Sequence, residues 1–219
     1  FNDGFNNVNE NHYFFRAYET GSGNDLIWIA GDRNSGSDKD LKVVVWFENE
    51  ARYRMGIVNN FFGSGNFGDS DFHHLVIRFG GAYNSNFSIT CDGTAQTVSN
   101  SGTAQAGDGF DNNVDKYYVG DSANLSFSIS ELVIYNDHSS GASGTPSNAE
   151  LYNGSSAVPG KFFDPTVYKT SKLMHYYKFQ DTGQSPNDTT TLVYDRWKKG
   201  GNADNLAAHG AGDAIAYSS

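Results

Sequence analysis

The chain has 219 residues, with 15 Lys and Arg against 25 Asp and Glu, and a formal net charge of −10. Such an acidic chain offers no electrostatic footprint for a phosphate backbone, so composition excludes nucleic acid as a partner. A single Cys excludes an internal disulfide framework, and no apolar run approaches the ~20 residues of a membrane span.

Short apolar blocks with a two-residue period recur along most of the chain, separated by turns rich in Gly, Asn, Asp and Ser. This pattern predicts antiparallel strands. The predicted strands are residues 13–18, 26–30, 41–47, 51–58, 74–79, 87–91, 94–98, 116–119, 125–129, 132–135, 174–179 and 192–194. The length suits one β-rich domain, so we expect residues 1–219 to form a single domain.

Turn and helix signals lie between these strands. Asp92-Gly93 separates two strand blocks and predicts a two-residue hairpin turn, because its backbone must adopt positive φ. Residues 99–113 are predicted to form a loop. One helix is expected near residues 145–154, with Thr145 as its cap and Pro146 at its first position. The expected fold class is therefore all-β with one short helix.

Three blocks of sequence occur in the order of a known family. They are FHHLVIRFGG (72–81) with SITCDG (88–93), then YVG (118–120) with FSISELVIYN (127–136), then AELYNG (149–154) with HYYKF (175–179) and Asp195. Together they resemble the laminin-G-like domains of bacterial surface and phage structural proteins. The chain departs from the family at Phe72, where the family has Trp, and at Ser130, where it has Asp. The resemblance implies a concanavalin A-like jelly roll, a sandwich of two antiparallel sheets around one core.

Catalysis needs evidence of its own, because this fold hosts both glucanases and lectins. A retaining glucanase places two carboxylates about 5–5.5 Å apart, and laminarinase-type enzymes supply them from a Glu-x-Asp-x-x-Glu strand. The chain lacks that pattern, and its nearest approximation is Glu48 and Glu50, between two predicted strands where a hairpin tip is expected. We therefore expect that the protein is not an enzyme. A divergent glycoside hydrolase using Glu48 and Glu50 is one alternative, and a purely structural capsid or appendage subunit is another.

Calcium is the candidate cation, because oxygens spaced two residues apart in a loop can converge on a hard ion. The candidate ligands are Asp108, Asp111, Asn113 and Asp115. They do not complete an EF-hand loop, since Lys116 stands where that loop needs Gly. Solvated turns are the alternative interpretation, and no other cofactor is expected.

Sugar recognition needs an aromatic ring against the apolar side of a pyranose, with polar groups for the hydroxyls. Phe61, Phe62 and Phe67 lie in a loop rich in Asn, Gly and Ser, and Tyr83 with Asn84 is a second candidate. Loop phenylalanines can instead fold back to close the end of a sandwich.

Four further side chains are expected to have structural roles. Trp28 and Trp46 lie inside predicted strands, where they are core or sheet-face residues, and Cys91 follows an alternating apolar run and is expected in the core. His73 is expected to pack or to make a local hydrogen bond. The sequence as a whole favours a non-catalytic module, extracellular or on a cell or virion surface, that binds a glycan or a neighbouring surface or virion protein.

Overall fold

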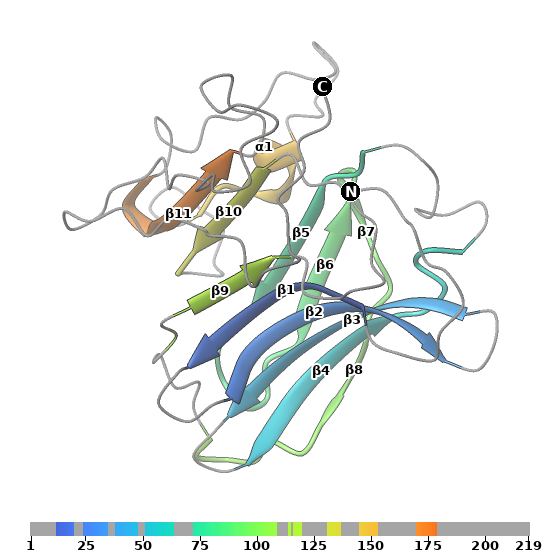
Figure 1. Cartoon of the computed structure of the whole chain (residues 1–219), viewed down its shortest axis with the longest axis vertical. Coiled ribbons are helices and arrows are strands. Elements are labelled where there is room, and N and C mark those ends of the chain that lie inside the picture. Colours follow the sequence, from blue (N-terminus) through green and yellow to red (C-terminus); the bar gives the residue numbers. More distant parts are fainter. Residues whose placement is uncertain are drawn as a thin grey trace, which may run out of the picture. The chain divides into compact units, whose positions relative to one another are not determined.

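The computed structural model describes residues 12–19, 24–34, 38–47, 51–63, 72–108, 114, 116–119, 131–136, 145–152 and 170–178. Internal contacts divide the chain into two compact units, Phe1–Ser128 and Ile129–Ser219. The described parts of both are mostly β, with antiparallel sheets (Figure 1). The expected organisation as one domain over residues 1–219 stays a prediction.

A six-stranded antiparallel sheet forms the larger part of the first unit, in the order β8-β4-β3-β2-β1-β9 (Figure 1). Its strands are β1 (His12–Glu19), β2 (Asn24–Asn34), β3 (Asp38–Phe47), β4 (Arg52–Val58), β8 (Ser99–Gly102) and β9 (Lys116–Val119). The first four strands follow one another as a meander, and β8 and β9 arrive from later in the chain to pair with its two edges.

The second sheet of this unit has three strands, β5 (Leu75–Phe79), β6 (Phe87–Cys91) and β7 (Thr94–Ala95). The turn between β6 and β7 is the predicted two-residue hairpin, because Asp92 and Gly93 have φ of 47° and 76°. Two successive positive φ values match the twist of the flanking strands. This prediction is confirmed.

One hydrophobic core joins the two sheets of the first unit. Its buried members include Leu41, Val43, Val45 and Phe47 of β3, together with Phe87, Ile89 and Cys91 of β6. Side chains alternate along a strand, so one face of β3 supplies all four of its core residues. The two sheets therefore face each other across this core.

Two predictions about the strands are wrong. Residues 99–102 belong to β8 and not to a loop, and the strand expected at 94–98 ends at Ala95. All four residues of β8 keep exposed or partly exposed surface, so this edge strand has no apolar alternation for a sequence pattern to detect. The expected strands at 125–129 and 192–194 lie outside the described residues.

The second unit contains an antiparallel pair of strands, β10 (Glu131–Tyr135) and β11 (Leu173–Lys178). A short 3₁₀ helix, η2 (Thr170–Lys172), lies directly before β11 in the chain. Its α-helix, α1 (Asn148–Tyr152), is the only one in the described part of the chain.

The predicted cap of α1 is wrong. Ser147, not Thr145, caps the helix: the Glu150 backbone N–H donates to Ser147 Oγ at 3.2 Å, and the Ser147 N–H donates to Glu150 Oε2 at 2.7 Å. This reciprocal pair is a capping box, which needs Glu or Gln three residues after the cap. Thr145 has Asn148 at that position, whereas Ser147 has Glu150.

Candidate functional site

The six-stranded sheet has a second face, on the side away from the core. Because the core residues of β3 alternate, Lys42, Val44 and Trp46 project from the opposite side. Register extends this face across neighbouring strands: Trp28 of β2 lies opposite Val44, and Tyr53 of β4 lies opposite Trp46. We call this surface the aromatic face and define it by Tyr13, Arg16, Trp28, Trp46, Tyr53 and Tyr118.

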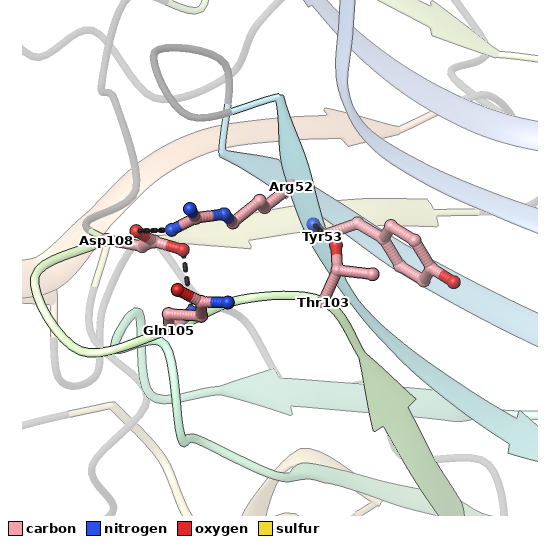
Figure 2. A network of polar contacts seen from close by, with 5 residues as sticks. All are labelled: Arg52, Tyr53, Thr103, Gln105 and Asp108. Atoms are coloured by element: carbon pink, nitrogen blue, oxygen red, sulfur yellow. Dashed lines mark hydrogen bonds and ion pairs between the residues drawn. The ribbon is translucent and has the colours of Figure 1, made fainter.

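Trp46 and Tyr53 form the first ring pair of the aromatic face. Their planes are nearly parallel, at 4°, with ring centroids 6.2 Å apart. Figure 2 shows the side chains of Arg52 and Tyr53 directed to opposite sides of β4. The Tyr53 backbone is held at both ends, because its N–H donates to Thr103 Oγ1 and its carbonyl accepts from the N–H of Thr103 at 3.0 Å.

The second group of rings lies on β1, β2 and β9. Tyr13 meets Trp28 edge to face, with centroids 5.7 Å apart at 87°. The Arg16 guanidinium carbon lies 5.3 Å from the Tyr13 centroid and 5.1 Å from that of Tyr118. A cation between two rings contributes about 0.5–1 kcal/mol per contact at partly exposed sites and fixes the orientation of the guanidinium.

The side chains that define the aromatic face are partly buried, so each keeps some surface in contact with solvent. Flat rings and a fixed set of guanidinium donors are the groups that hold the apolar side and the hydroxyls of a ligand such as a sugar. Trp28 and Trp46 lie on strands that the sequence predicts, but the sequence does not indicate which face of the sheet they occupy. The signal that reveals the site is the register of β2, β3 and β4.

The loop phenylalanines lie elsewhere. Phe61 and Phe62 are each 1% exposed and belong to the core, where Phe62 packs on Phe14 with centroids 5.5 Å apart. This burial leaves no ring surface for a ligand, and it agrees with the alternative in which these side chains close the end of the sandwich. Phe67 lies outside the described residues.

Tyr83 and Asn84 lie in the turn between β5 and β6. The turn is closed by a hydrogen bond from the Ser85 N–H to the Ala82 carbonyl at 2.9 Å. Arg54 of β4 donates from Nε to the Ser85 carbonyl at 3.3 Å, so the turn is tied to β4. A binding role for Tyr83 and Asn84 stays a prediction.

Asp108, the first of the candidate calcium ligands, is 7% exposed and has protein partners on both oxygens. Arg52 Nη1 donates to Oδ1 at 2.9 Å, and the Gln105 N–H donates to Oδ2 at 2.7 Å (Figure 2). This carboxylate therefore anchors the segment after β8 to β4. The other candidate ligands, Asp111, Asn113 and Asp115, lie outside the described residues, so calcium binding stays a prediction. Glu48 and Glu50 also lie outside the described residues, so the hydrolase alternative stays a prediction as well.

A second cluster lies where β6 ends and β5 begins. His73 Nδ1 and Asp92 Oδ2 are 2.6 Å apart, the His74 N–H donates to Asp92 Oδ1 at 2.8 Å, and the Asp92 N–H donates to the His74 carbonyl at 2.9 Å. Burial lowers the pKa of His74, and the negative charge of Asp92 partly opposes that shift. Cys91 is 0% exposed and belongs to the core, as expected.

Donor atoms of His73, Cys91 and Asp92 all lie within 4.8 Å of one another. The sequence pattern alone does not indicate that these three residues lie together. The register of the β5–β6 hairpin is the signal that places them close together, because Leu75 pairs with Cys91 and His73 lies two residues before Leu75.

Comparison of the chain with models of protein families, with curated proteins and with solved structures finds no match in any of the three. The likeness to laminin-G-like domains rests on the sequence blocks alone and stays a prediction. In the part of the chain that the structure describes, no helix has both the length and the apolar character needed to cross a membrane.

Proposed function

We propose that the protein is a non-catalytic glycan-binding module with a concanavalin A-like jelly-roll fold, and that the aromatic face is its binding surface. The observation that carries the proposal is the arrangement of Trp46 and Tyr53, two nearly parallel rings that are cross-strand neighbours on the side of the sheet opposite the core. We place the module outside the cell, on a cell or virion surface, where adhesion to a glycan or to a neighbouring protein is its role.

Ring geometry supports a sugar as the ligand. A pyranose has an apolar side that packs on an aromatic plane, and the hydroxyls around it need donors and acceptors. Trp46 and Tyr53 supply the planes, and Arg16 supplies guanidinium donors whose direction is fixed by Tyr13 and Tyr118. These groups stand on strands of one hydrogen-bonded sheet, so binding would need little ordering of the protein.

The absence of a Glu-x-Asp-x-x-Glu strand in the sequence supports binding without turnover. The net charge of −10 favours neutral glycans as ligands, because an acidic protein repels polyanionic glycans at long range.

The test is a broad glycan array with the full chain, in the presence and absence of a calcium chelator, followed by Trp46→Ala and Tyr53→Ala. We expect each variant to bind the selected glycan about tenfold more weakly, which is about 1.4 kcal/mol. Phe72→Ala is the matched control, because Phe72 is 54% exposed and lies in the segment before β5, which belongs to the other sheet.

Three outcomes would contradict parts of the proposal. Silence across the array favours a structural subunit, and binding that survives both variants moves the site away from the aromatic face. Turnover of a β-glucan that vanishes with Glu50→Gln favours the hydrolase. Loss of binding with chelator alone would support the calcium prediction.

A further inference from the structure

We propose that His73, Cys91 and Asp92 form a binding site for a zinc ion, independent of the glycan-binding face. The side chains bring an imidazole, a thiol and a carboxylate together, with donor atoms no more than 4.8 Å from one another. These are the three ligand types that zinc takes in proteins.

The fold brings the three residues together from two segments. Cys91 is the last residue of β6, and Asp92 begins the tight turn that follows. His73 comes from the segment entering β5, because Leu75 pairs with Cys91. Asp92 is oriented by the His74 N–H at 2.8 Å and lies 2.6 Å from His73 Nδ1, so a backbone donor positions the Asp92 carboxylate and that carboxylate contacts the His73 ring.

The distances are compatible with one ion after small side-chain rotations. Bonds of about 2.0–2.3 Å in a tetrahedron place ligand atoms about 3.3–3.6 Å apart. The His73 and Asp92 atoms would separate slightly from 2.6 Å, and Cys91 Sγ would approach from within 4.8 Å. The hydrogen bond between His73 and Asp92 is replaced by one bond from each residue to the ion. The proton of that hydrogen bond leaves Nδ1, so the imidazole binds as its Nε2–H tautomer, and the Cys91 thiol releases its proton to solvent.

The ligand types indicate which metal the site would bind, and the burial of the ligands indicates how an ion would reach it. Cys91 is 0% exposed, whereas the His73 and Asp92 side chains are 10% and 29% exposed, so the cluster runs from the core to the surface. A cation enters from the Asp92 side, where water completes a fourth position. Thiolate and imidazole ligands select zinc over calcium or magnesium. Because His73 precedes β5, and Cys91 and Asp92 lie at the end of β6, the ion would join these two strands, and we assign the site to stabilising the β5–β6 hairpin.

The experiment uses the full chain, freed of metal with a chelator and titrated with Co²⁺ as a spectroscopic probe and then with Zn²⁺. We expect one equivalent of Co²⁺ to produce a thiolate-to-cobalt charge-transfer band in the near ultraviolet, and Zn²⁺ to displace it. Zn²⁺ should also raise the melting temperature, because it binds the folded chain in preference to the unfolded one.

Variants then test the ligand set. Cys91→Ala should abolish the charge-transfer band, and His73→Asn and Asp92→Asn should each weaken Zn²⁺ binding more than tenfold. His12→Gln, on β1 of the other sheet, should leave binding unchanged. The spectrum of the unmodified chain is decisive even where a variant fails to fold: bound Co²⁺ without a thiolate band, or no bound Co²⁺, overturns the proposal, as does wild-type Zn²⁺ affinity in folded Cys91→Ala.

Discussion

Gly56 of β4 is a contact point between the two sheets of the first unit. A Cβ atom placed on Gly56 would lie 2.8 Å from Cδ2 of Phe87 and 2.9 Å from its Cβ. Phe87 begins β6 and is 4% exposed. Because Cβ is fixed by the backbone, no change of the Phe87 rotamer relieves the second contact. Gly56→Ala must therefore displace β6 from β4.

Two opposing terms set the size of the effect on the free energy of unfolding. Replacing Gly by Ala in a compatible backbone stabilises by about 0.4–1 kcal/mol, because the unfolded chain loses conformational freedom. Overpacking a filled core costs about 1–3 kcal/mol. The direct overlap with Phe87 makes the second term larger, and we expect a net loss of about 1–2 kcal/mol. Urea denaturation followed by Trp fluorescence measures it as a lower midpoint at unchanged slope.

The matched test repeats Gly56→Ala in a Phe87→Ala background, which removes the Cγ and Cδ2 atoms at 2.9 Å and 2.8 Å and leaves only the contact with Cβ. The cost of Gly56→Ala should fall there by about 1 kcal/mol, since residues in contact are coupled. A neutral or stabilising Gly56→Ala, or an equal cost in both backgrounds, would refute the packing of the two sheets on one core. The assignment of an outer aromatic face depends on that packing.

Three further predictions concern local interactions: the cap of α1, the ion pair between Asp108 and Arg52, and the turn at Gly93. Ser147→Ala should destabilise α1 by about 1 kcal/mol, seen as faster hydrogen exchange of the Glu150 amide, whereas Ser147→Thr keeps the cap and should exchange nearly as slowly as the parent. Asp108→Ala should cost about 1–3 kcal/mol in thermal unfolding, because it removes the buried acceptor of an ion pair with the partly exposed Arg52. Asp108→Asn keeps one acceptor and should cost less; equal losses would contradict this role. Gly93→Ala should cost about 1–2 kcal/mol in urea, because its φ is 76°, and Gly93→Asn should cost less.

Strands and turns were predictable where their signals are local. The blocks at 87–91 and 116–119 match β6 and β9 residue for residue, and Asp92-Gly93 makes the expected turn. β8 was missed because an exposed edge strand needs no apolar face. The cap of α1 was misplaced because Thr145 and Ser147 are both good caps, and only the reciprocal bond to Glu150 separates them.

The aromatic face was not predictable, because the sequence of β3 does not reveal which side faces the core. Val43, Val44 and Val45 are consecutive and all at most 3% exposed, so alternation disappears at the centre of the strand. Only pairing with β2 and β4 shows that Val44 and Trp46 share a face with Trp28 and Tyr53. For loop residues such as Phe61, composition cannot decide between a ring turned to solvent and a ring turned inward.

The many aspartates of this chain have a structural explanation in the described part. Asp40 accepts from the Asn60 N–H at 2.6 Å, Asp92 accepts from the His74 N–H, and Asp108 accepts from Gln105. A short carboxylate reaches backbone donors near strand ends, where the ladder leaves N–H groups to satisfy. An Asp-rich loop is therefore weak evidence for a cation by itself. Asp92 differs because an imidazole and a thiol stand beside its carboxylate, and that change in donor chemistry, not the acidity of the chain, is what points to a metal.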